Sequence, residues 1–147
     1  MVKLVTSYFF DNSESVLLNT IRWRGDSCLE EFWTDNSSHC YPDLSLYVLT
    51  DRGTLSAAEE FSYNLQCLER AVLIGEATGG AAHPCRLFEL TAELSVAIPI
   101  GEAINPITNK NWEQGGVIPD INTNSDNALK VALKRLGLPE EAHTAIQ

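Results

Sequence analysis

The chain has 147 residues, enough for one domain with one hydrophobic core, and its 44% apolar and 20% charged residues are typical of a globular protein. The net charge of −10 argues against nucleic acid and against anionic membranes as partners, because no basic stripe exists to neutralise phosphates. No apolar run approaches the roughly 20 residues of a membrane span, and Met1-Val2-Lys3-Leu4 does not begin a signal-peptide pattern.

The cysteines are too scattered to predict a metal centre. None of the four belongs to a C-x-x-C pair, so the sequence predicts neither a zinc site nor a cofactor. Free thiols are the favoured interpretation, and one disulfide is the alternative. The residues concerned are Cys28, Cys40, Cys67 and Cys85.

The first third of the chain predicts a short element followed by a hairpin. Residues 1–10 are short and apolar and form either the end of a helix or a strand. Residues 15–24 and 28–34 are rich in β-branched and aromatic residues, and the turn sequence Arg24-Gly25-Asp26-Ser27 separates them. This pattern predicts two antiparallel strands, with a loop after them over residues 35–43.

The middle of the chain predicts a strand, a helix and a second strand. Residues 46–50 and 71–75 are continuously apolar, as is typical of buried parallel strands. Between these two runs, residues 56–68 have apolar side chains at helical spacing. The expected buried stripe of this helix consists of Ala57 or Ala58, Phe61, Leu65 and Leu68.

The last third predicts another hairpin and a closing helix. Residues 87–90 and 94–100 are expected to pair through a tight turn. A helix should begin near Ser125 or Asp126 and end before Gly137 and Pro139. Its expected apolar stripe is Leu129, Ala132, Leu133 and Leu136. Together the elements predict an α/β fold, a mostly parallel sheet with flanking helices and β-hairpins, as one domain over residues 1–147.

Ser56 has two competing interpretations. With Glu59 three residues later it forms a capping-box sequence, in which the serine hydroxyl caps the helix and the carboxylate bonds back. It also follows a buried strand, where a helix N-terminus can stabilise a developing oxyanion and a turn can expose a hydroxyl. The two roles conflict, because a hydroxyl bonded to its own helix is a poor nucleophile.

Three further positions have a structural and a functional interpretation. The pair Gly79-Gly80 is either a plain turn or a place where backbone must approach a ligand closely. His83, which precedes Pro84, is either a structural loop residue or a site residue. Glu113 is either a solvated surface charge or a carboxylate held beside Trp112.

Residues 46–121 resemble the C-terminal half of the catalytic domain of the tail-specific (C-terminal processing) serine proteases. The resemblance is greatest to the branch with the tricorn protease core and the interphotoreceptor retinoid-binding proteins. The matching segments are Tyr47-Val48-Leu49-Thr50, Ser56-Ala57-Ala58-Glu59-Glu60-Phe61, Arg70-Ala71, Gly75-Glu76, Thr78-Gly79-Gly80, Ala82-His83-Pro84, Ile104-Asn105-Pro106-Ile107-Thr108, Asn111-Trp112-Glu113, Gly116-Val117 and Pro119-Asp120-Ile121.

The resemblance implies a crotonase/Clp-protease-like fold and a serine peptidase acting on peptides or proteins. It implies Ser56 as nucleophile, the Ala57 N–H as an oxyanion donor and Glu113 as the orienting acid. By the same resemblance Gly79, Gly80 and His83 line the substrate cleft. The alternative is a module of the same fold that binds a retinoid or fatty acid without catalysis, and an inert partial domain is a third possibility.

The sequence also departs from the family pattern. Ala81 stands where the bacterial branch has its lysine base, so a serine–lysine dyad is not expected. The tricorn-like branch takes its histidine base and a second oxyanion glycine from upstream segments that have no counterpart here. We therefore expect a partial domain, weakly active alone, whose open sheet edge favours a homo-oligomer. Family members are often exported, and the sequence does not decide the compartment.

Overall fold

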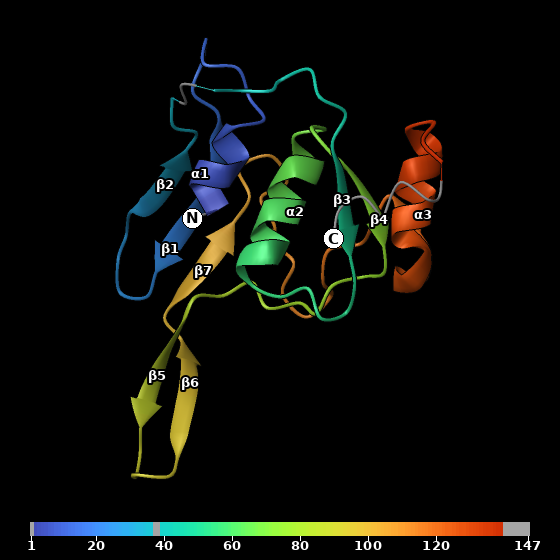
Figure 1. The fold of residues 1–147 in the computed structure, drawn as a ribbon. Helices are drawn as coiled ribbons and strands as arrows, with labels where there is room; N and C mark the ends of the chain where they lie inside the picture. The colour runs from blue at the N-terminus through green and yellow to red at the C-terminus, as the bar shows by residue number, and fades with distance from the viewer. Residues whose placement is uncertain (1, 37–38, 140–147) are drawn as a thin grey trace.

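The computed structural model describes residues 2–36 and 39–139, which form a mixed α/β domain (Figure 1). Three short sheets and three helices make up this part of the chain. The elements are α1 (Val2–Ser7), β1 (Leu17–Trp23), β2 (Leu29–Trp33), β3 (Tyr47–Thr50), α2 (Ala57–Cys67), β4 (Val72–Gly75), β5 (Cys85–Glu89), β6 (Ser95–Pro99), β7 (Gly101–Ile104), β8 (Ile121–Asn122) and α3 (Ser125–Arg135).

The first sheet is antiparallel and has the strand order β2-β1-β7. The predicted hairpin of β1 and β2 is confirmed, with Thr20 opposite Glu31 and a register shift between Leu17 and Asn19. Strand β7 was not anticipated as a separate strand. It pairs with β1, and the Thr20 hydroxyl bonds to the Ile104 carbonyl oxygen at 2.8 Å. This pairing brings the end of the second hairpin beside the first.

The second sheet contains the predicted parallel strands, in the order β3-β4-β8. Helix α2 packs on β4, while α3 packs on β3 and β4 (Figure 1). Adjacent residues of β4 face opposite sides of the sheet. Leu73 packs in a cluster with Leu65 of α2, and Ile74 packs in another with Ala128 of α3. The strand–helix–strand prediction for residues 46–75 is thus confirmed.

The expectation of a mostly parallel sheet was wrong. Only β3, β4 and β8 pair in parallel, whereas β1, β2 and β7 form an antiparallel sheet and β5 and β6 pair by themselves. The physical reason is connection length. Short turns join β1 to β2 and β5 to β6, and only antiparallel strands can be joined in this way. The parallel strands need long crossovers, one from β3 to β4 through α2 and one from β4 to β8.

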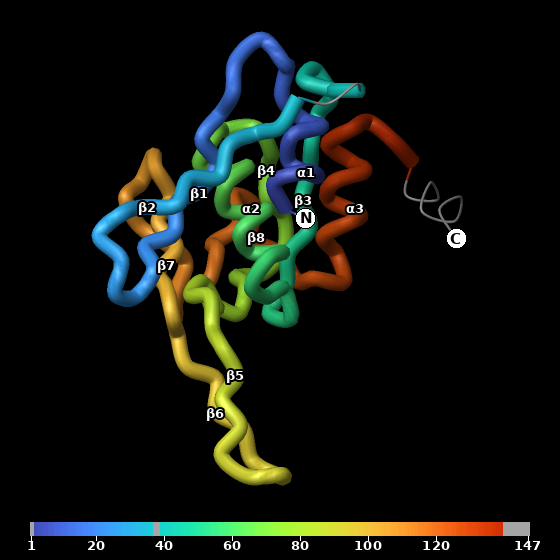
Figure 2. Tube along the Cα trace, turned by 90° about the vertical axis from the view of Figure 1, so that its left-hand side faces the viewer, coloured from blue at the N-terminus to red at the C-terminus, as the bar shows by residue number. Residues whose placement is uncertain are grey.

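The β5–β6 hairpin projects from the body of the domain in both views (Figures 1 and 2). Nearly all its residues are exposed. The large apolar side chains that it exposes are Leu87, Phe88, Leu90, Leu94 and Ile98. The predicted pairing is confirmed, but the apolar residues that suggested it do not reach the core.

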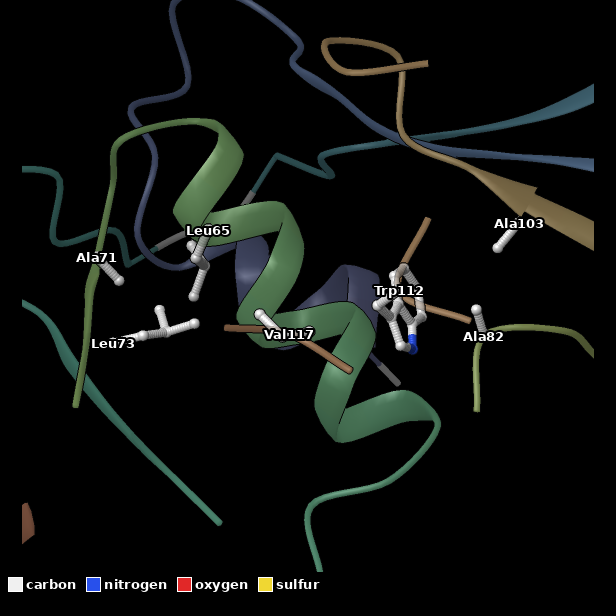
Figure 3. Close-up of a cluster of buried hydrophobic side chains, with 7 residues drawn as sticks. All are labelled: Leu65, Ala71, Leu73, Ala82, Ala103, Trp112 and Val117. Carbon is white, nitrogen blue, oxygen red and sulfur yellow. The ribbon is translucent and has the colours of Figure 1, made fainter. Parts of the chain in front are cut away.

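Helix α2 lies between the two larger sheets and carries the main core (Figures 1 and 3). Leu65 is fully buried among Leu73, Val117 and Trp112. The predicted apolar stripe is only partly right, because Ala57 and Ala58 are exposed. Their place inside is taken by polar residues of the same helix, which are Glu59, Ser62 and Asn64.

The N-terminal segment folds back onto α2. Helix α1 contacts α2, the rings of Phe9 and Phe61 lie 6.3 Å apart, and the Arg70 guanidinium donates to the Phe9 carbonyl oxygen at 2.6 Å. Helix α3 buries Ala132 and Leu133 as expected, but Leu129 and Leu136 are exposed and Ala128, which was not expected in the stripe, is buried. Within residues 2–36 and 39–139, no helix combines the length and the apolar character needed to cross a membrane.

We predict that the chain self-associates through β3. In the part of the chain that the structure describes, β3 pairs only with β4, and Leu49 on this edge strand is 43% exposed. An open apolar edge recruits another strand. Size exclusion with light scattering should give a dimer or larger species, and Leu49→Lys should shift it to monomer. Leu44→Lys is the matched control, since Leu44 is 55% exposed but lies in a loop. A monodisperse wild-type monomer would contradict the prediction.

Candidate active site

Ser56 lies at the end of a tight turn that leads from β3 into α2. The Asp51 carboxylate accepts hydrogen bonds from the Gly53 N–H at 2.8 Å and the Thr54 hydroxyl at 3.2 Å. The Thr54 hydroxyl in turn accepts one from the Asp51 N–H at 3.1 Å. The turn is therefore fixed by its own side chains, and it sets the direction in which α2 begins.

The backbone of Ser56 adopts an unusual conformation, with φ 53° and ψ −115°. An ordinary N-cap residue has β-region angles, and a positive φ is uncommon for a residue other than glycine. Such strain persists only where the surroundings enforce it, and it is concentrated at functional sites. The Ser56 side chain is exposed. The predicted capping box of Ser56 and Glu59 is present, but the positive φ and the exposure of Ser56 distinguish it from an ordinary N-cap.

Glu59 is the residue that enforces this conformation. Its side chain is fully buried, and its Oε2 accepts a hydrogen bond from the Ser56 N–H at 2.8 Å. The same carboxylate accepts from the Thr78 hydroxyl at 2.5 Å, the Gly80 N–H at 2.6 Å and the Ala81 N–H at 2.9 Å. Burial alone would raise the pKa of Glu59, but the hydrogen bonds outweigh it and the pKa is lowered.

Thr78 extends this network to the third matching segment. Its hydroxyl accepts from the Val117 N–H at 2.6 Å, and its own N–H donates to the Val117 carbonyl oxygen at 3.2 Å. Three segments that are distant in sequence therefore meet at one buried carboxylate: the start of α2, the turn after β4, and the loop before β8. The sequence predicted the Glu59 bond to Ser56 but not its role as the junction.

The two glycines pack against other parts of the protein, Gly80 against backbone and Gly79 against a side chain. Gly80 has φ +85°, and a β-carbon there would come within 2.9 Å of the Gln114 backbone. A β-carbon on Gly79 would meet the Leu55 side chain. Gly79 lines a separate cavity at the carboxyl ends of β4 and β8, together with Arg52 and Glu76. The close approach that was expected toward a ligand is made toward the neighbouring loop instead.

Glu113 holds the loop that carries His83. Its N–H donates to Asn111 Oδ1 at 3.0 Å, which fixes the turn. Its Oε2 accepts from the N–H groups of Ala82 at 2.8 Å and His83 at 3.3 Å. The structure therefore places the Glu113 carboxylate against the backbone of this loop, and among the described residues it makes no hydrogen bond to Ser56.

A small cavity of about 110 Å³ brings Ser56 and His83 together. Figure 3 shows the Trp112 ring beside Ala82 and Ala103, which form part of its wall. Gly79, Gly80 and Glu113 are not among the lining residues. The wall is formed by Asn19, Ile21, Ser56, Ala57, Glu60, Ala82, His83, Pro84, Ala103 and Trp112.

Three polar residues of this wall were missed as site residues from the sequence. Asn19 is 1% and Trp112 3% exposed, and the Asn19 amide donates to Glu60 Oε1 at 3.3 Å. Burial raises the pKa of Glu60, and the hydrogen bond from Asn19 offsets part of that rise. The only available signal was an asparagine within an apolar strand pattern. The pairing of β1 with β7 that brings it here could not be inferred from spacing.

Comparison with known proteins identifies the family. A family model for peptidase family S41 matches residues 4–123. The chain belongs to peptidase family S41. A carboxyl-terminal-processing protease from Synechocystis is 32% identical over 107 residues, which cover 73% of this chain and 24% of that protein. The chain thus spans about a quarter of the length of this curated relative.

Solved structures of greater length share the fold of this S41 chain. The photosystem II D1 C-terminal processing protease superposes with a TM-score of 0.65 at 24% identity, covering 83% of this chain and 30% of that one. A Parabacteroides merdae protein superposes with a TM-score of 0.74 at 19% identity, covering 92% of this chain and 46% of that one. The fold of this chain is therefore shared with part of these longer proteins.

We predict opposite pH effects for two neighbouring glutamates of α2. Replacing Glu59 by Gln removes an acceptor of four hydrogen bonds, so the free energy of unfolding at neutral pH should fall by roughly 2–4 kcal/mol. Because the folded-state pKa is lowered, this stabilisation is complete above the unfolded-state pKa and is lost as the pH falls through the folded-state pKa.

Glu60→Gln is the matched control for Glu59→Gln. The pKa of Glu60 is raised, so its ionisation opposes folding as the pH rises above the unfolded-state value. Its replacement should leave neutral-pH stability unchanged or slightly increased. Urea unfolding between about pH 3 and 7 checks both variants. An equal loss in both variants at neutral pH would contradict the assignment.

Proposed function

We propose that this chain carries the nucleophile of a serine-type peptidase site, with Ser56 as the attacking residue on a crotonase/Clp-protease-like fold. The observation that carries the proposal is the strained Ser56 at the start of α2, facing the same cavity as His83. Membership of a peptidase family supports it. The substrate would be a peptide or protein chain, and the name of the Synechocystis relative suggests a carboxyl-terminal segment.

The oxyanion would be stabilised by the start of α2. Ala57 is the first residue of the helix, so its N–H has no acceptor within the helix. It is exposed and lines the cavity beside Ser56. A backbone N–H at a positive helix end is suited to the charge that develops on the scissile carbonyl oxygen.

The chemical step would be an acyl transfer. The Ser56 Oγ attacks the carbonyl carbon, its proton passes to a base, and the protonated amine leaves as the acyl-enzyme forms. Water then hydrolyses the ester and frees Ser56. The described groups in the cavity that could take a proton are His83 and Glu60, both on its wall. Glu113 would act by fixing the loop of His83 through the Ala82 and His83 N–H groups.

Gly79 and Gly80 would contribute indirectly. Gly80 donates its N–H to Glu59, and through that carboxylate it fixes the backbone of Ser56. Gly79 lies in the wall of the neighbouring cavity of about 590 Å³, where an extended peptide could continue. Both glycines are thus proposed to shape the cleft through backbone placement.

The non-catalytic alternative, a retinoid or fatty-acid module, draws little support from the described cavities. The Ser56 cavity of about 110 Å³ is well below the several hundred Å³ typical of drug-sized ligands. The larger one is lined mostly by polar residues, among them Arg52, Glu76, Asn122 and Asn124. A serine peptidase site remains the better account.

A fluorophosphonate probe tests the proposed nucleophile. We expect slow but selective labelling at Ser56, because a strained hydroxyl at a helix N-terminus reacts where a capping hydroxyl does not. Labelling should disappear in Ser56→Ala and persist in Ser125→Ala. Ser125 is the matched control, since it also lies at the start of a helix that follows a strand. Equal labelling of both serines, or none at Ser56, would refute the assignment.

We further predict little turnover by this chain alone. The described residues supply one oxyanion donor, and losing one such donor typically lowers turnover about 10²–10³-fold. Release of fragments from an unstructured peptide should be the same for the wild type and Ser56→Ala. Robust cleavage that depends on Ser56 would contradict this prediction. The His83→Gln variant would then show whether the imidazole is the base.

A further inference from the structure

The residues that form the wall of the cavity beside Ser56 carry a concentration of buried, unpaired polar atoms. Among the described residues, four buried side-chain nitrogen or oxygen atoms lack a hydrogen-bond partner, and three of them belong to the wall of this cavity. They are Asn19 Oδ1, His83 Nδ1 and Trp112 Nε1. Buried polar groups are nearly always paired, so a cluster of three in one small cavity indicates a site that is completed by something else.

The three atoms have different hydrogen-bonding needs. The indole Nε1 of Trp112 can only donate, and the Oδ1 of Asn19 can only accept. His83 Nδ1 accepts when the imidazole carries its proton on Nε2. In that tautomer, with Nδ1 bound to an occupant, His83 cannot also take the Ser56 proton, which leaves Glu60 as the group on this wall that could. The bond from the Asn19 amide to Glu60 Oε1 fixes the asparagine so that its oxygen is the free atom. The wall therefore offers one donor and two acceptors.

The remaining wall limits the size and charge of an occupant. Ala57, Ala82 and Ala103 have small side chains and leave a space of about 110 Å³. A carboxylate in this space would meet the Asn19 oxygen and the Glu60 side chain, which repel it. An aliphatic side chain would leave all three atoms unpaired, which a polar site penalises heavily.

We propose that this cavity is a specificity subsite for a primary carboxamide, the side chain of asparagine or glutamine, adjacent to the bond that Ser56 attacks. A carboxamide has one oxygen for the Trp112 N–H and two N–H groups for Asn19 and His83, so it pairs all three atoms at once. This inference rests on the proposed peptidase function, because only then is the occupant of the cavity a substrate side chain. The cavity and its unpaired atoms stand without it.

Peptide binding to the ¹⁵N-labelled chain tests the proposal. Three blocked tripeptides that differ only in a central Asn, Asp or Leu are titrated, and the indole N–H resonances are followed. Trp112→Phe identifies the Trp112 signal among the three tryptophans. The Asn peptide should shift that signal and bind at least about tenfold more tightly than the Asp and Leu peptides.

Matched variants separate recognition from packing. Trp112→Phe keeps an aromatic ring against Tyr63, whose centroid lies 5.4 Å away, and removes the N–H donor together with part of the indole ring. The Leu peptide therefore reports the effect of the lost ring volume, and the Asn peptide reports that effect plus the lost donor. The variant should weaken the Asn peptide about tenfold and leave the Leu peptide unchanged. Trp33→Phe is the control, because Trp33 bonds to Glu31 on β2 and is 40% exposed. It should affect neither peptide.

The proposal is overturned if Leu or Asp binds as well as Asn, if no peptide binds, or if Trp112→Phe weakens the Asn and Leu peptides equally. If that variant does not fold, the wild-type peptide series decides alone. Ser56 labelling by the fluorophosphonate is scored separately. Labelling without carboxamide preference refutes the subsite and leaves the peptidase proposal standing. Carboxamide preference without labelling supports the subsite and refutes the proposed nucleophile.

Discussion

The buried carboxylate of Glu59 is the interaction on which the rest of the site depends. It lies in the first turn of α2 and accepts four hydrogen bonds, from Ser56, Thr78, Gly80 and Ala81. No cation forms a salt bridge with it among the described residues. Its charge is balanced instead by hydrogen bonds, which are enough to lower its pKa despite burial.

The position of α2 explains why this carboxylate can be buried. A surface helix buries one apolar stripe, but α2 lies between two sheets and is covered on several sides (Figure 1). One side packs Leu65 into the core. The others bury Ser62, whose hydroxyl donates to the Ala58 carbonyl oxygen one turn earlier, and Asn64, whose Oδ1 accepts from the amide of Asn105 in a distant loop. The helix therefore joins the apolar core to a polar layer, and Ser56 stands at the edge of that layer.

Local patterns predicted most elements correctly because those elements are decided locally. Residues 46–50 and 71–75 are short, continuously apolar runs that favour parallel strands, although β3 proves to be a partly exposed edge strand. Residues 56–68 carry apolar side chains at helical spacing. The mostly parallel sheet was wrong because strand pairing depends on partners far away in sequence: β7 joins β1 across about eighty residues. The apolar residues of β5 and β6 were read correctly as strands, yet the structure leaves them exposed.

The sequence by itself determined the helix that begins at Ser56, the strands on either side of it and the bond from Glu59 to Ser56, because each depends on neighbours within a few residues. Only the tertiary structure decided what faces Ser56. His83 lies on the cavity wall with Asn19 and Trp112. The Glu113 carboxylate accepts a hydrogen bond from the His83 N–H, and Gly80 packs on the backbone of Gln114. These neighbours come from strands and loops whose pairing is set by long-range packing, and no local spacing specifies which side chains that packing brings into one cavity.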